Sequence, residues 1–269
     1  MSGLLLRLAG PLQSWGERSA FTPVRDTAPF PTRSALIGMF AAAEGIGRNE
    51  TIPDRYHDLR LTVRVDRPGV RLVDYHTAGG GFPKDRTAAT SGGSNKGAAV
   101  ITRRHYLADA VFVVAVTAPD ATLERLADAL TRPHWAPYLG RRSCVPDEPL
   151  LLRRHVTNPD EELRTRVPLS RIPPRTEDGD GQQTGTIAVE FLAEQPAPTG
   201  ESAEPVPVDI IDVNDVPVSF AQHGRSHTGR RLHRTQVPVP RSLAGPPDTL
   251  MQRLIDYALN TPAPEEAPA

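Results

Sequence analysis

Arginine is the most abundant side chain in this sequence that could bind a polyanion. Lysine occurs only at Lys84 and Lys96, so nearly all of the 31 basic residues are arginines. A guanidinium group donates paired hydrogen bonds to phosphates and stacks on bases. The formal net charge of −1 conceals a basic segment, because residues 176–216 hold ten acidic and no basic residues. Residues 1–175 are therefore basic, which favours a polyanionic partner, with an ordinary arginine-rich exterior as the alternative.

Two polar residues stand where a helix is expected to begin. Apolar residues at helical spacing follow Pro31-Thr32-Arg33-Ser34, and Thr32 or Ser34 can cap the first turn. A helix N-terminus offers unpaired N–H groups and a partial positive charge, which together suit a phosphate. We therefore expect Arg33 and Ser34 to contact a phosphate of a polyanionic partner. In the alternative, the Arg33 side chain extends into solvent.

The loop after the first expected strand holds a second candidate group. Gln13, Ser14 and Trp15 lie between Gly10-Pro11 and Gly16, which mark turns. Trp15 could stack on a base, and Gln13 could hydrogen-bond a base edge. The alternative is that Trp15 fills the edge of the core.

Arginines also flank two later turns. Arg103, Arg104 and His105 follow a glycine-rich segment, and because neighbouring strand residues face opposite ways, only one of the two arginines is expected to face RNA.

Tyr138, Arg141 and Arg142 surround Gly140, a combination that suits base stacking and phosphate binding. In the alternative, this is a structural turn whose arginines pair with Asp147 and Glu148.

A catalytic role would fall to His76, acting as a general base with Tyr75 and Lys84 assisting. That combination would make the chain a metal-independent RNA endonuclease. Lys84, however, lies in a glycine-rich segment that would hold it poorly. A single histidine at a strand end is more often structural. We therefore expect no catalytic residues and place His76 among the RNA contacts.

Several other classes of function are excluded by what the sequence lacks. It has no run of eighteen apolar residues, no phosphate-binding loop and no dinucleotide-binding motif. Cys144 is the only cysteine, and Gly224 and Gly229 argue against a helix that would align His223 with His227. We expect no metal, no cofactor and no membrane contact, and a cytoplasmic location.

The elements that must position these residues follow from hydrophobic periodicity. Strands are expected at 3–8, 59–65, 70–75, 110–117 and 150–156, and helices from 31–34 to 45 and at 120–131, with Asp120 as a cap. This order approximates a ferredoxin-like (RRM-like) βαββαβ palm of the α+β class, whose open sheet face binds single-stranded RNA in RRM domains. Residues 77–102 hold six glycines and predict a long mobile loop or a projecting β-hairpin thumb.

The later part of the chain is acidic and proline-rich. We expect a palm with its thumb insertion over 1–175, a less regular, partly β portion over 176–260, and a disordered tail over 261–269. Within the second portion, short strands are expected at 186–192, 216–220 and 236–239.

Four separated motifs resemble one family. They are RLAGPLQSWG (7–16), FPTRSALIGMFAAAEGI (30–46), DYHT (74–77) and PYLGRRSC (137–144), and TRRHYLADA (102–110) supports them. The sequence resembles the CasD family of the RAMP superfamily, found in type I-E CRISPR Cascade complexes. The resemblance implies a non-catalytic subunit that binds the 5′ handle of the CRISPR RNA (crRNA) and caps the filament of backbone subunits. The implied partners are crRNA, the backbone and large subunits and, through the assembled complex, target DNA, in antiviral defence.

Overall fold

Two apolar runs form the centre of a seven-stranded sheet. β1 (Gly3–Ala9) and β7 (Val111–Thr117) are buried at every position and pair antiparallel along their whole length. A continuous apolar run is typical of a strand that is covered on both faces. The computed structural model describes residues 2–16, 22–79, 83, 86, 99–172, 185–195, 207–221 and 224–259.

The sheet extends from this centre into the later part of the chain. Its spatial order is β10-β11-β9-β4-β7-β1-β8, with every neighbouring pair antiparallel. The other five strands are β4 (Arg60–Arg67), β8 (Leu151–Val156), β9 (Thr186–Ala193), β10 (Val208–Ser219) and β11 (Ser226–Pro240). Expected strands at 216–220 and 236–239 are short parts of the long β10–β11 hairpin. One sheet therefore crosses residue 175, and the division into separate portions there stays a prediction.

Two helices cover one face of the sheet. α1 (Arg33–Glu44) and α2 (Asp120–Thr131) pack on the alternate side chains of β1, β4 and β7 that point to this face. Both helices were predicted, and Thr32 caps α1 as expected, with its Oγ1 accepting from the N–H of Ala35 at 3.3 Å. The prediction that Asp120 caps α2 was wrong, because Pro119 holds the cap position and no side chain bonds there.

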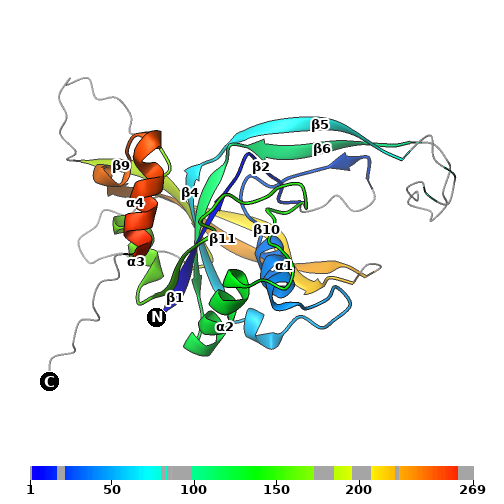
Figure 1. Cartoon of the computed structure of the whole chain (residues 1–269), viewed down its shortest axis with the longest axis horizontal. Helices are drawn as coiled ribbons and strands as arrows, with labels where there is room; N and C mark the ends of the chain where they lie inside the picture. Colours follow the sequence, from blue (N-terminus) through cyan, green and yellow to red (C-terminus); the bar gives the residue numbers. More distant parts are fainter. Residues whose placement is uncertain are drawn as a thin grey trace.

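The opposite face of the sheet is covered as well. α3 (Pro159–Thr165) and α4 (Pro247–Leu259) pack on the alternate side chains of β1 and β7 that point to this second face. Neither helix was predicted. Figure 1 shows α3 and α4 on the far side of the sheet from α2. This face of β1 and β7 is therefore closed to solvent.

A buried ion pair fixes this second layer. Arg64 and Asp66 are fully buried on β4, with Nε and Oδ1 2.7 Å apart. The Arg64 guanidinium also donates to the carbonyls of Leu163, Val167 and Pro168, and Asp66 accepts from the N–H of Ser170 at 2.8 Å. These bonds satisfy a buried charge that would otherwise be costly.

A second sheet carries the predicted projection. β5 (Val70–Ala78) and β6 (Val100–Ala108) form an antiparallel hairpin, in which the pairing runs from Val70–Ala108 to Ala78–Val100. Two short strands, β2 (Leu12–Gln13) and β3 (Val24–Arg25), also pair with β6. Figure 1 shows this hairpin extending away from the seven-stranded sheet. Residues 80–82, 84–85 and 87–98 of the expected insertion lie outside the described residues, as does the tail at 261–269.

Short 3-10 helices occupy Asp54–Tyr56 and Arg241–Leu243. In the described ranges, no helix combines the length and apolarity that crossing a bilayer requires.

Candidate nucleic-acid interface

The expected phosphate site at the start of α1 is occupied by the protein itself. The backbone N–H of Arg33 donates to Asp215 Oδ2 at 2.6 Å, so a carboxylate from β10 takes the place predicted for phosphate. The Arg33 guanidinium turns inward and donates to the carbonyls of Leu59 and Tyr56 at 2.7 and 2.9 Å. Arg33 is only 6% exposed. Both the phosphate prediction and the solvent alternative for Arg33 were therefore wrong.

Four charged side chains around this point form a largely buried network. Arg33 and Arg230 both donate to Glu194 Oε1 at 2.6 Å, and Arg230 bonds both carboxylate oxygens of Asp215, at 2.6 and 2.8 Å. Two cations and two anions are thus paired within one cluster, which is the arrangement that makes buried charge tolerable. The network fastens the β10–β11 hairpin to the start of α1.

Ser34 faces the same hairpin. Its Oγ lies 3.0 Å from His227 Nε2, and Ser34 is buried. Burial lowers the pKa of the His227 imidazole, the positive charge of Arg225 lowers it further, and Asp215 opposes both effects. Ser34 is therefore a contact between α1 and β11.

His227 predicts a pH dependence of stability. Its pKa is lower in the folded state than the unfolded value of about 6.5, so the unfolded chain binds the proton more readily. The stabilisation is complete above about pH 6.5 and is lost as the pH falls through the folded-state pKa. Thermal unfolding between pH 7.5 and 5 should show a steeper loss in the wild type than in His227→Gln. Equal slopes would contradict this assignment.

The first loop is part of the core. Gln13 Nε2 donates to the carbonyls of Leu8 and Ala110 at 3.0 and 2.8 Å, and its Oε1 accepts from Trp15 Nε1 at 3.2 Å. Gln13 is 0% exposed and Trp15 only 1%. Base reading by Gln13 and stacking by Trp15 are contradicted, because neither side chain reaches the surface. Ser14 is also buried, and its Oγ donates to the carbonyl of His105 at 3.1 Å.

The turn at Gly140 is built around an inward-facing arginine. Arg141 donates to the carbonyls of His105 and Arg25 at 2.9 and 3.2 Å, and its guanidinium lies 4.5 Å from the centre of the Tyr106 ring. Arg141 thus joins its own turn to the segments around Arg25 and His105. It does so through carbonyl groups and an aromatic ring, and not through Asp147 and Glu148 as the alternative expected. Tyr138 is half-buried and Arg142 is exposed, so these two stay predicted RNA contacts.

The candidates lie in the middle of the β5–β6 hairpin, between its Val70–Ala108 and Ala78–Val100 ends, and not at its base as expected. Arg103 is exposed, whereas Arg104 is half-buried and its Nε donates to Thr102 Oγ1 at 3.1 Å, in keeping with the expected alternation. Tyr75 is 65% exposed and stands directly opposite Arg103 in the hairpin register. An exposed aromatic ring beside an exposed guanidinium is suited to single-stranded RNA.

Two histidines lie close to this pair. His76 Nδ1 is 3.3 Å from Asp74 Oδ2, in an exposed pair. His105 is half-buried, and its Nδ1 has no hydrogen-bond partner among the described residues. Lys84, the other expected member of a catalytic group, lies outside the described residues. Tyr75 was considered only as an assistant to His76, although its place in the DYHT motif at the end of a predicted strand could have shown it at the surface.

Arg225 lies near Tyr138 and near a second arginine, Arg48. Arg225 is exposed as a whole residue, but partial burial of its guanidinium lowers the pKa of that group, and the nearby positive charge of Arg48 lowers it further, while Tyr138 opposes both. Arg48 follows α1 and Arg225 lies just before β11, so only the tertiary fold brings them together. Neighbouring like charges favour an anion between or beside them.

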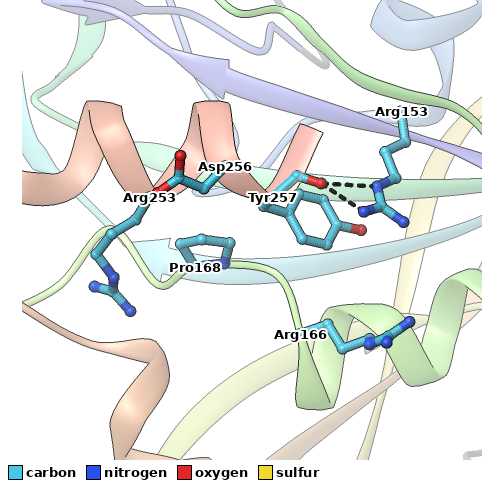
Figure 2. Close-up of a pocket in the computed structure, with 6 residues that line it drawn as sticks. All are labelled: Arg153, Arg166, Pro168, Arg253, Asp256 and Tyr257. Carbon is cyan, nitrogen blue, oxygen red and sulfur yellow. Dashed lines mark hydrogen bonds between the residues drawn. The ribbon is translucent and has the colours of Figure 1, made fainter. Parts of the chain in front are cut away.

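A hollow between α4 and the segment after α3 also gathers arginines. It has a volume of about 370 Å³, and its lining comprises Arg153, Arg166, Pro168, Arg253, Asp256 and Tyr257. In Figure 2, Arg153 bonds the Tyr257 carbonyl and Arg253 points away from Arg166. Arg166 pairs with Glu162 at 3.0 Å. These bonds lie within the protein, so the hollow is where α4 docks onto the sheet.

Across the described ranges, no group of three or more His, Cys, Asp or Glu side chains is placed to hold a metal ion.

Comparisons with known proteins point to one family. The family model described as "CRISPR-associated protein (Cas_Cas5)" matches residues 3–233. The CRISPR system Cascade subunit CasD of Escherichia coli (strain K12) is 40% identical over 164 residues, which cover 56% of this chain and 70% of that protein.

Solved structures agree. A chain of a structure titled "CRISPR RNA-guided surveillance complex" is 47% identical with a TM-score of 0.81, covering 95% of this chain and 99% of that one. A structure titled "Crystal structure of Cas protein" is 30% identical with a TM-score of 0.55, covering 91% of this chain and 99% of that one.

Proposed function

Because this chain belongs to the CRISPR-associated Cas5 family, we propose that it is the subunit of a Cascade-type surveillance complex that binds the 5′ handle of crRNA. It caps the filament of backbone subunits and performs no catalytic step. Its partners are the crRNA, the backbone and large subunits and, through the complex, the target DNA. The similarity to a surveillance-complex chain over 95% of this sequence supports membership of such an assembly.

The palm of this subunit is ferredoxin-like. In chain order the elements are β1, α1, β4, β7, α2 and β8, interrupted by the β5–β6 hairpin. The four strands lie side by side in the order β4-β7-β1-β8 with antiparallel neighbours, as expected for a βαββαβ unit. β9, β11 and β10 extend that unit beyond β4, and the hairpin is its thumb.

The exposed pair of Tyr75 and Arg103 is the observation that carries the proposed role. RNA cannot bind the covered faces of the sheet, whereas the hairpin projects from it with an aromatic ring and a guanidinium side by side. The ring stacks on an unpaired base and the guanidinium binds the adjoining phosphate. Tyr138, Arg142, Arg48 and Arg225 supply a second contact region for the same strand.

Removing this pair is expected to weaken RNA binding strongly. Tyr75→Ala should cost about 1–3 kcal/mol, roughly 5- to 150-fold in affinity, because one stacked base is lost. Arg103→Ala should also lower the slope of log affinity against log salt by about 0.7, the value for one phosphate contact on a single strand. Fluorescence anisotropy with a labelled single-stranded repeat RNA measures both effects.

The matched control is Arg154→Ala on β8, because its side chain is 56% exposed and paired with Asp128. It should leave both affinity and salt slope unchanged. Equal losses in Arg154→Ala and Arg103→Ala would mean that the basic surface binds RNA without a defined site.

A further inference from the structure

Two large aromatic side chains are exposed in the described part of the chain. They are Tyr75, at 65%, which the proposed RNA site already uses, and Trp135, at 47%. Trp135 belongs to neither of the two apolar clusters that form the core, whereas the other tryptophan, Trp15, is 1% exposed and packs within one of them. The core therefore does not account for the position of the Trp135 ring.

The segment that carries Trp135 is fixed to the end of α1. The N–H of Trp135 donates to the carbonyl of Ala42, in the last turn of that helix, at 3.2 Å. The N–H of His134 bonds the next carbonyl, that of Ala43, at 2.8 Å. The His134 ring lies edge-on to the Trp135 ring, with centroids 4.6 Å apart and an interplanar angle of 81°. Because the indole is already held in place, little conformational entropy is lost when it binds a flat ligand.

Arginines without carboxylate partners lie in the same part of the molecule. Arg225 is close enough to Arg48 to be affected by its charge, and no ion pair within the described ranges joins either arginine to a carboxylate. Glu50, in the turn that holds Arg48, accepts from the N–H of Gly47 at 2.6 Å. Two neighbouring positive charges that lack a carboxylate partner favour an anion beside them.

The chain itself keeps these groups near Trp135. Arg48 comes three residues after Gly45, where a Cβ would lie 3.0 Å from His134 Cγ, so the end of α1 touches the ring that supports Trp135. Tyr138, which also lies near Arg225, comes three residues after Trp135. Three residues span at most about 11 Å. Two aromatic rings and two guanidinium groups therefore share one area of the surface.

This combination selects an unpaired nucleotide as the ligand. An indole ring stacks on the flat face of a base, and guanidinium groups bind the phosphates beside it. In a double helix the bases are already stacked on one another, so only a single strand can offer a free base to the ring.

We propose that Trp135 stacks on an unpaired base of the crRNA whose adjoining phosphates are bound by Arg48 and Arg225. This inference rests on the proposed function and adds a second stacking position to that of Tyr75. One ring lies on the β5–β6 hairpin and the other in the loop after α2. A strand that contacts both therefore crosses from the thumb to the palm.

Tryptophan fluorescence tests the inference directly, because the chain has two tryptophans and Trp15 is closed to solvent. Single-stranded repeat RNA is titrated into the full chain, and tryptophan emission is followed beside the anisotropy of the labelled RNA. Stacking should remove most of the Trp135 emission as the RNA saturates the protein. In Trp135→Phe, the remaining emission should stay constant while the anisotropy still reports binding.

Affinities of variants separate stacking from charge. Trp135→Ala should weaken binding by about 5- to 150-fold, the effect of one lost stacked base, and leave the slope of log affinity against log salt unchanged. Trp135→Phe should bind nearly as well as the wild type, because a phenyl ring also stacks. Arg48→Ala should instead lower the salt slope by about 0.7, the value for one phosphate contact.

Three results would overturn this inference and leave the Tyr75 site standing. The first is RNA binding by the wild type with unchanged tryptophan emission, and the second is equal affinity of the wild type and Trp135→Ala. The third is Trp135 emission that responds to purified partner subunits and not to RNA, which would make the ring a protein contact. A wild-type chain that binds no repeat RNA would overturn the proposed function as well, so the two failures are distinguishable.

Discussion

Replacing Asp215 with asparagine is expected to lower the free energy of unfolding by about 3–5 kcal/mol. The Asp215 carboxylate accepts from the start of α1 and from Arg230, at 2.6 to 2.8 Å, and only 2% of its side chain is exposed. The asparagine amide keeps the size of the side chain but removes its charge. Arg33 and Arg230 would then share Glu194 alone, which leaves an uncompensated buried charge.

Chemical denaturation at pH 7.5 measures this loss, and Asp212→Asn on the same strand is the control. The Asp212 side chain is 85% exposed and lies 3.5 Å from Arg231, so that variant should change the free energy of unfolding by less than about 1 kcal/mol. If Asp215→Asn and Asp212→Asn lost similar amounts, the network would not be what joins the β10–β11 hairpin to α1.

Gly140→Ala is expected to have the other large effect, a loss of at least about 4 kcal/mol or failure to fold. Gly140 has a φ of +86°, a conformation that L side chains rarely adopt. A Cβ built there lies 1.7 Å from the carbonyl oxygen of Ser14, which is backbone and cannot rotate away. The clash would separate the 137–144 turn from the first loop, whose Ser14 N–H donates to Leu139 at 3.0 Å.

Soluble yield and thermal unfolding measure that effect, with Gly38→Ala as the matched control. A Cβ at Gly38 within α1 has Phe220 at 3.8 Å as its nearest neighbour, an ordinary contact. Gly38→Ala should stabilise the protein by up to about 1 kcal/mol, because alanine favours helix. A soluble Gly140→Ala protein with wild-type melting behaviour would show that the two loops do not pack as described.

Local patterns were sufficient to predict the central elements. The apolar run at 110–117 became β7, and Thr32 and Gly45 delimit α1 as expected from their capping chemistry. α3 and α4 were missed because their sequences follow proline-rich and charged segments, and their apolar residues become informative only once a sheet face needs covering. The sequence analysis therefore did not anticipate that the second face of the sheet is covered.

The candidate site was harder to predict, for a physical reason. A guanidinium that suits a phosphate suits a buried carboxylate or carbonyl equally well, so sequence alone could not separate Arg33 and Arg141 from Arg103. The partner of the Arg33 N–H, Asp215, lies 182 residues away, with no local signal of the contact. Charge reversal at Arg33 would therefore damage the fold and cannot test RNA binding, whereas Arg103 on the exposed hairpin can.

The most direct test is to purify the assembled complex, cross-link it with ultraviolet light, and sequence the RNA bound to this subunit. We predict guide RNAs that share one 5′ end, with cross-links from Tyr75 and the β5–β6 hairpin confined to the shared 5′ segment. Tyr75→Ala should remove those cross-links while the complex stays intact. A chain that purifies without RNA and cleaves repeat RNA in EDTA, or that cross-links along the whole guide, would contradict the proposed 5′-handle-binding role.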